Sequence, residues 1–131
     1  MRLCLGLAVL LSAVPALAQR AGGPHDGIYD GVVFQECRGG GRVRQDRTSA
    51  EVRGGEITIA GLPGDAPITG RIGANGAVTL PPVGLFQAGQ GQIFIGANNA
   101  RRFTGTHPGR GACSLGYDLR RSGPLPRGRG G

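Results

Sequence analysis

The chain has 131 residues, of which 27 are glycine and none is tryptophan, and its net charge is +7 at pH 7. This length allows one domain with a small core and excludes a multidomain enzyme. Aromatic residues make up 5% of the chain, too few for the base-stacking groove of a single-strand nucleic-acid binder. All basic residues are arginine, a bias that a GC-rich bacterial genome produces without selection for function.

Residues 1–18 have the layout of a secretory signal peptide. Arg2 supplies the positive start, the apolar run LCLGLAVLLSAV follows, and ALA at 16–18 provides the small residues of a cleavage site. The run is shorter than the roughly 20 residues of a membrane-spanning helix, and Cys4 lies on the wrong side of it for a lipoprotein. We expect cleavage after Ala18 and a mature chain, without a transmembrane segment, that is secreted or periplasmic in a Gram-negative bacterium. Loss of Arg2 leaves 14 arginines against 8 acidic residues, a net charge of +6.

The remaining chain predicts an all-β domain between two loose tails. Residues 19–26 and 122–131 are rich in glycine and proline without apolar periodicity, so we predict disordered tails, the second of them basic. Between them, over residues 27–121, apolar residues alternate with a period of two. The predicted strands span 27–37, 48–53, 56–61, 67–72, 77–81, 92–97, 101–107 and 112–121, with a weaker candidate at 84–88.

Short turns between these runs favour consecutive hairpins. Gly54-Gly55 and Asn75-Gly76 are residue pairs that tolerate the positive φ of tight hairpin turns. The hexapeptide IGANGA at 72–77 recurs as IGANNA at 95–100, which indicates either two similar hairpins or a duplication. We therefore expect a small antiparallel meander of about eight strands that forms a barrel or a barrel-like sandwich.

Two cysteines remain after removal of the leader. Cys37 shares its alternation with Tyr29 and Val33, and Cys113 shares its alternation with Leu115, Tyr117 and Leu119. Two cysteines in an oxidising compartment form one disulfide most often, which would bring the first and last strands together and close the sheet. Free or metal-binding thiols are the alternative, but these cysteines lack the paired spacing of a zinc site.

The segment from 26 to 121 resembles a group of small exported proteobacterial proteins. The resemblance rests on DGIYDGVV at the start, a cysteine after the first strand, RRFTGTH, and a cysteine that opens the last strand before LRR. It implies a secreted β-barrel with a bond between Cys37 and Cys113, and it implies no activity. The hairpins are also similar to those of biotin-binding barrels, but the tryptophans that line that ligand site are absent.

The sequence predicts neither catalysis nor a cofactor or metal. His25 and His107 fall in expected loops, and no nucleophile motif accompanies them. Asp30, Glu36 and Asp118 have the outward alternation of the first and last strands. We expect them to pair across strands with Arg120 or Arg121 rather than to line a catalytic cleft.

Arginines are the candidate binding residues. The segment 37–47, CRGGGRVRQDR, is expected to form a mobile basic loop, and it lacks the lysine and helix of a phosphate-binding loop. A positively charged surface for a polyanion would combine it with later arginines. The candidate residues are Arg42, Arg44, Arg47, Arg101, Arg102, Arg110, Arg120 and Arg121. Codon bias together with solubility is the competing explanation for the excess of arginine.

Two functional hypotheses remain. The first is a non-catalytic exported module, structural or protein-binding, with an envelope protein as its partner. The second is a ligand-binding barrel that holds a polyanion such as lipopolysaccharide on its arginine face, or a small hydrophobe in its lumen. The expected inward glycines Gly31, Gly70 and Gly105 would leave room in that lumen. Their expected neighbours there are Ile68, Ile72, Ile93 and Phe103.

Overall fold

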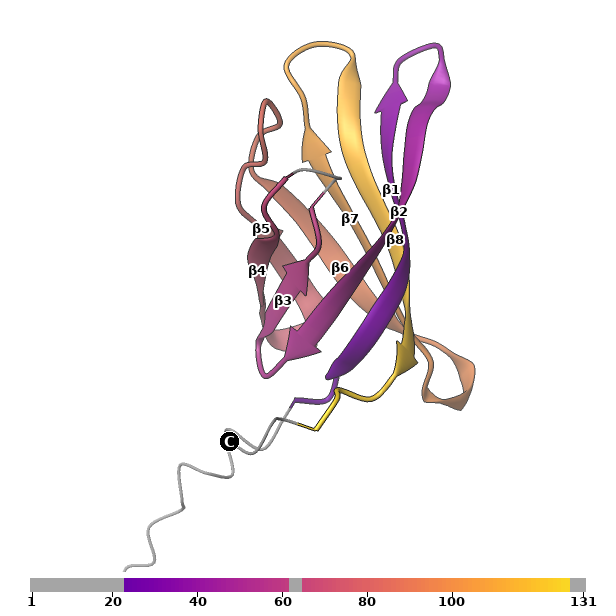
Figure 1. Ribbon diagram of the computed structural model, residues 1–131, viewed down its shortest axis with the longest axis vertical. Helices are drawn as coiled ribbons and strands as arrows, with labels where there is room; N and C mark the ends of the chain where they lie inside the picture. Colours follow the sequence, from indigo (N-terminus) through magenta and orange to yellow (C-terminus); the bar gives the residue numbers. More distant parts are fainter. Residues whose placement is uncertain (1–22, 62–64, 128–131) are drawn as a thin grey trace, which may run out of the picture.

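The computed structural model describes residues 23–61 and 65–127, and within them eight β-strands follow one another along the chain (Figure 1). The strands are β1 (Gly27–Cys37), β2 (Gly41–Arg53), β3 (Glu56–Ile59), β4 (Ile68–Ile72), β5 (Ala77–Leu80), β6 (Gly89–Ile95), β7 (Arg101–Pro108) and β8 (Cys113–Gly123). Two short 3₁₀ turns, η1 (Ala74–Gly76) and η2 (Ala97–Asn99), precede β5 and β7. The predicted signal peptide with its cleavage site after Ala18, and the tail residues 19–22 and 128–131, lie outside the described residues.

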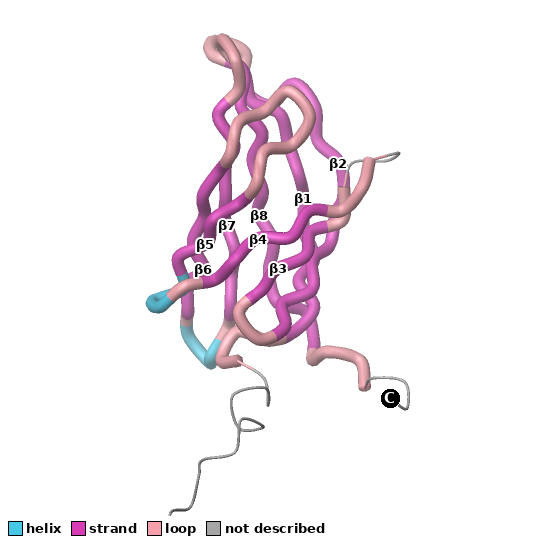
Figure 2. The backbone as a smooth tube through the Cα atoms, turned by 90° about the vertical axis from the view of Figure 1, so that its left-hand side faces the viewer, coloured by secondary structure: helices cyan, strands magenta, loops and turns pink. Residues whose placement is uncertain are grey.

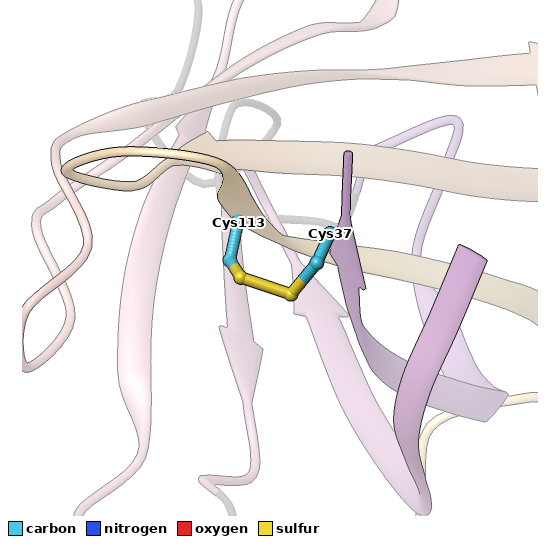
Figure 3. Close-up of a disulfide and its surroundings, with 2 residues drawn as sticks. All are labelled: Cys37 and Cys113. Atoms are coloured by element: carbon cyan, nitrogen blue, oxygen red, sulfur yellow. A yellow bond between two sulfur atoms is a disulfide. The ribbon is translucent and has the colours of Figure 1, made fainter. Parts of the chain in front are cut away.

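The sheet closes into a barrel because β1 pairs with β8 as well as with β2. All pairings are antiparallel, and apart from this seam each joins strands that are consecutive in the chain. Cys37 lies directly opposite Cys113 in the seam, and a disulfide joins their sulfur atoms at 2.06 Å (Figure 3). The predicted all-β meander and the Cys37–Cys113 disulfide are thus confirmed, and the sheet is a closed barrel rather than an open sandwich.

The barrel interior is filled by the side chains that alternate inward along the strands. Tyr29, Phe103 and Leu119 are fully buried, and the rings of Phe103 and Tyr117 stack with their centroids 6.1 Å apart. Further buried side chains come from β2, β3, β5 and β6, among them Val52, Ile57, Val78 and Ile93. A barrel of this size has an interior just wide enough for its own side chains.

The inward glycines do not leave free space in the lumen, contrary to the expectation. A Cβ atom on Gly105 would lie 2.8 Å from Cζ of Phe103, and one on Gly70 would lie 2.8 Å from Cδ2 of Leu80. At Gly31 the backbone oxygen of Asp118 occupies the corresponding position. These glycines therefore accommodate large neighbours and adjacent backbone, so they supply no argument for a ligand inside the barrel.

The basic segment 37–47 is not a mobile loop, which corrects the prediction. Only the turn 38–40 separates β1 from β2, and β2 pairs with β1 from Gly41 onward. The resulting hairpin extends past β3 to β6 at one end of the barrel (Figure 1). The weak candidate strand at 84–88 is also absent, since this stretch makes only an isolated bridge between Val83 and Phe86.

The repeated hexapeptides form the same kind of turn. Asn75 and Gly76 in η1 have φ values of 66° and 78°, and Asn98 and Asn99 in η2 have φ values of 55° and 63°. Glycine and asparagine are the residues that adopt this left-handed conformation most easily. Both turns lie at the same end of the barrel, shown in cyan in Figure 2. The two hexapeptides thus form two similar hairpin turns.

The segment Gly23–Asp26 is tied to this end of the barrel, so the prediction of a disordered tail is wrong for these four residues. The Tyr29 hydroxyl donates to the His25 carbonyl oxygen at 2.7 Å. Asp26 accepts a hydrogen bond from the Gly54 backbone at 2.9 Å. At the other terminus β8 continues through Gly123, two residues beyond the predicted domain boundary. No helix in the described part of the chain is long and apolar enough to cross a membrane.

Candidate anion-binding surface

The eight candidate arginines do not form one surface, because the fold distributes them along the barrel, although Arg42 and Arg102 border one hollow together with Asp118. Arg42 and Arg44 lie on the extended β1–β2 hairpin, and Arg110 lies in the β7–β8 loop at the same end (Figure 1). Arg47 lies farther along β2. The other four lie at the opposite end, where β7 begins and β8 ends: Arg101, Arg102, Arg120 and Arg121.

Arginines of the β1–β2 hairpin are accompanied by acidic or amide partners. Arg44 Nε lies 3.2 Å from a carboxylate oxygen of Asp46. Arg42 donates to Gln45 Oε1 at 3.0 Å, and its guanidinium carbon lies 3.9 Å from the ring centroid of Phe34. Because these contacts engage both arginines within the hairpin, they are explained as packing and pairing of the hairpin itself.

At the opposite end, two arginines face each other on the outer wall. Arg102 of β7 and Arg120 of β8 are register partners, and both are exposed. Arg102 donates from Nε and Nη2 to the two carboxylate oxygens of Asp118, at 2.9 and 2.8 Å. This hydrogen bonding lowers the pKa of Asp118, and the charge of Arg120 acts in the same direction. The charge of Arg42 also lowers the pKa of Asp118, so three arginines act on this one carboxylate.

Asp118 was expected to pair with Arg120 or Arg121, but it pairs with Arg102. Asp30 lies opposite Arg120 in the register but accepts a hydrogen bond from the Ser122 hydroxyl. Within the described part of the chain, neither Arg120 nor Arg121 forms an ion pair with a carboxylate. Arg121 donates from Nε to the backbone oxygen of Asp26 at 2.8 Å and remains exposed.

Arg101 differs from its neighbour because strand alternation turns it inward. Its residue is only 8% exposed, and Nη1 donates to the backbone and side-chain oxygens of Asn99 at 2.8 and 2.7 Å. It also donates to the Pro24 carbonyl oxygen and to His25 Nδ1. Burial lowers the pKa of His25, and the nearby charge of Arg101 lowers it further. Arg101 therefore closes the end of the barrel and does not belong to the exposed candidate surface.

Large apolar side chains accompany these arginines. Phe94 is 52% exposed and Ile95 is 60% exposed, although both belong to β6. Together with Gly96 and Ala100 they border a hollow of about 320 Å³ whose other lining residues are all arginine. The arginines at this hollow are Arg101, Arg102, Arg120 and Arg121. Four of the eight lining residues are thus arginine and the other four are uncharged, a combination that suits an anion with an apolar part.

Phe94 and Ile95 belong to the predicted strand 92–97 but were not among the predicted site residues. A signal was present, because two large apolar residues in succession point to opposite faces of a strand. At least one of them must then face outward. In the hairpin, Phe94 lies directly opposite the exposed Arg102 of the partner strand, and this pairing indicates a mixed apolar and basic surface.

Both ring nitrogens of His107 are engaged inside the barrel. His107 is fully buried in β7, not in a loop as expected. Its Nδ1 donates to the Gln87 carbonyl oxygen at 2.9 Å, so Nε2 accepts from the Tyr117 hydroxyl at 3.0 Å. Burial lowers the pKa of His107 and raises the pKa of Tyr117 to about 12, which keeps both groups neutral. Across residues 23–61 and 65–127, no three histidine, cysteine or acidic residues are grouped as a metal site would need.

The fold and this surface define a closed antiparallel barrel with a mixed basic and apolar end. Comparisons with protein-family models, curated proteins and solved structures find no match for the chain.

Proposed function

We propose that this protein is an exported, non-catalytic binding domain that holds an anionic ligand at the arginine end of the barrel. The arginine end comprises Arg102, Arg120 and Arg121 with the hollow beside them. The observation that carries the proposal is the lining of this hollow, which combines arginines with apolar residues and contains no acidic side chain from the described chain. Arg120 and Arg121 have no carboxylate partner among the described residues, and such guanidinium groups favour binding of phosphate, sulfate or carboxylate groups.

The packing of the barrel supports a binding role. Its interior is filled, and the disulfide joins the first and last strands directly. Both ring nitrogens of His107 are engaged inside the core, so that histidine supplies no base to an external substrate. A rigid frame that presents side chains on its outer wall binds a ligand without a large entropic cost of ordering.

Binding of heparin, a soluble sulfated polyanion, tests the proposal. The variant Arg120→Gln removes one exposed guanidinium group that has no ion-pair partner among the described residues. We expect severalfold weaker binding and a shallower dependence of the binding constant on salt, because one ionic contact is lost. Arg71→Gln is the matched control, since Arg71 is exposed on β4 and does not line the hollow.

The outcome separates the arginine end from general positive charge. If Arg120→Gln and Arg71→Gln weaken heparin binding equally, the protein binds through its net charge and the proposal is wrong. If neither variant changes the binding, the proposal is wrong as well. A selective effect of Arg120→Gln supports it.

A further inference from the structure

We propose that the ligand of the arginine end is the surface of an anionic phospholipid bilayer, entered by the tip of the β6–β7 hairpin. Phe94 and Ile95 would lie among the upper acyl segments while Arg120 and Arg121, which have no carboxylate partner among the described residues, contact headgroup phosphates. This inference rests on the proposed function, because it identifies the source of the anionic groups.

The shape of the hairpin favours insertion into a layer over contact with a flat protein surface. The β6–β7 hairpin projects beyond the barrel next to the end of β8 (Figure 1). Phe94 and Ile95 are adjacent in sequence and lie on opposite faces of β6, yet both are more than half exposed. A flat partner would cover one face of the hairpin and leave the other apolar side chain in water. A lipid layer surrounds a projecting tip and buries both side chains.

Apolar and basic side chains lie side by side at this end of the sheet. Phe94 of β6 pairs with Arg102 of β7, and Arg102 pairs with Arg120 of β8. Neighbouring strands lie about 4.8 Å apart, so the three backbone positions lie within roughly 10 Å of one another. Arginine side chains are long enough to direct their guanidinium groups back toward the headgroups while an adjacent phenyl ring enters the acyl boundary.

Charge complementarity selects an acidic bilayer over a neutral one. Arg102, Arg120 and Arg121 are exposed on this end, and the hollow beside them contains no acidic lining residue from the described chain. Each arginine near an anionic surface strengthens partitioning about fivefold. A soluble polyanion would satisfy the same arginines but would leave Phe94 and Ile95 exposed to water, which is why the bilayer is favoured.

The absence of tryptophan from the chain allows a direct test. In Phe94→Trp the only indole would report on the hairpin tip, and its emission should shift to shorter wavelength with vesicles of phosphatidylglycerol and phosphatidylcholine. Vesicles of phosphatidylcholine alone should produce no shift. Leu85→Trp is the matched control, because Leu85 is 81% exposed in the loop next to Pro108, at the other end of β7. Its emission should not change with either kind of vesicle.

A second pair of measurements separates this inference from the proposed function. Phe94→Ser and Ile95→Ser should each weaken vesicle partitioning about fivefold, since each removes a half-exposed apolar side chain. Leu85→Ser, which removes an exposed apolar side chain outside the hollow, should leave both vesicle partitioning and heparin binding unchanged. Circular dichroism checks that these exposed substitutions preserve the barrel. If wild-type protein binds heparin through Arg120 but ignores anionic vesicles, the membrane inference is wrong and the proposed function stands. If Arg120→Gln alters neither binding, both are wrong.

Discussion

Removal of the Cys37–Cys113 bond should cost the barrel about 4 kcal/mol of stability. The bond links residues separated by 76 positions, and the chain-entropy relation assigns roughly that free energy to a loop of this length. The two cysteines are already register partners in the β1–β8 seam. The native barrel can therefore keep its pairing without the bond, and most of the cost should come from the larger freedom of the unfolded chain. Against a typical total of about 5–15 kcal/mol, this loss is large.

The assay is urea unfolding of wild type and of Cys37→Ser/Cys113→Ser, each with and without reductant. We expect wild type in reductant to match the double variant, and reductant to have no effect on the variant itself. In thermal unfolding the same loss should lower the midpoint by about 20 °C, since 1 kcal/mol corresponds to roughly 4–8 °C for a domain of this size. Circular dichroism at low denaturant should show an unchanged sheet.

Two results would contradict this reasoning. A stability loss below about 1 kcal/mol would mean that the bond does not constrain the unfolded chain as the loop length requires. Loss of the β-sheet signal in the double variant, under conditions without denaturant, would mean that the seam depends on the bond itself. The second result would show that the β1–β8 register is not sufficient to close the barrel.

Three further predictions concern the buried polar groups and the outer wall. Burial lowers the pKa of His107 in the folded protein, so the unfolded chain takes up a proton at higher pH than the folded chain does. The free energy of unfolding should therefore fall as the pH decreases below about 6.5, by at most about 1.4 kcal/mol per pH unit, until the folded-state pKa is reached. Arg101→Met should lower stability by about 2 kcal/mol in urea unfolding, because it removes the charged donors that close the barrel end. Gly116→Ala should lower the free energy of unfolding by about 1–3 kcal/mol, because the added Cβ would lie 2.5 Å from Cζ of Phe34. Gly123→Ala is the control, since a Cβ added at Gly123 would have no atom within 4 Å.

Each of these predictions has a discriminating measurement. The dependence of the free energy of unfolding on pH should become weaker in His107→Gln. If this dependence is unchanged in the variant, groups other than His107 cause it. Arg102→Met is the control for Arg101→Met, since Arg102 is exposed on the same strand. Equal losses would contradict the role given to Arg101. For Gly116→Ala, adding Phe34→Ala should relieve most of the clash between the new Cβ and the Phe34 ring. If the stability losses of the two single variants simply add in the double variant, this clash is not the cause of the loss.

The alternation of residues along the chain was sufficient to predict the architecture. In β8, Leu115, Tyr117 and Leu119 alternate with polar residues, and all three are buried in the barrel. The bond between Cys37 and Cys113 was predicted from the presence of two cysteines in an expected oxidising compartment, and it implied the pairing of the first and last strands. The inference from alternation succeeded because one face of each strand packs against a core and the other faces solvent, the condition under which a period of two is visible.

The alternation signal disappears where a strand has no such division. The first part of β2, from Gly41 to Arg47, extends beyond most of the barrel, and both of its faces carry polar residues. The predicted strand 92–97 begins three residues after the observed start of β6 at Gly89, for a different reason. Gly89 and Gly91 face large rings, since a Cβ at these positions would lie 2.8 Å from Nδ1 of His107 and 2.6 Å from Cε2 of Phe103. A strand whose inward positions are glycine shows no hydrophobic period.

The candidate surface was predictable only in part, because composition does not distinguish structural arginines from exposed ones. Arg101 and Arg102 are adjacent and equally basic, but Phe103 is buried and Arg101 shares its face of β7. Applying the same alternation to the arginines would have assigned Arg101 to the barrel interior and Arg102 to the outer wall. What alternation could not supply is the projection of the β6–β7 hairpin, which exposes Ile95 despite its inward parity. That exposure depends on where the barrel ends, and it makes the apolar half of the surface a property of the closed fold.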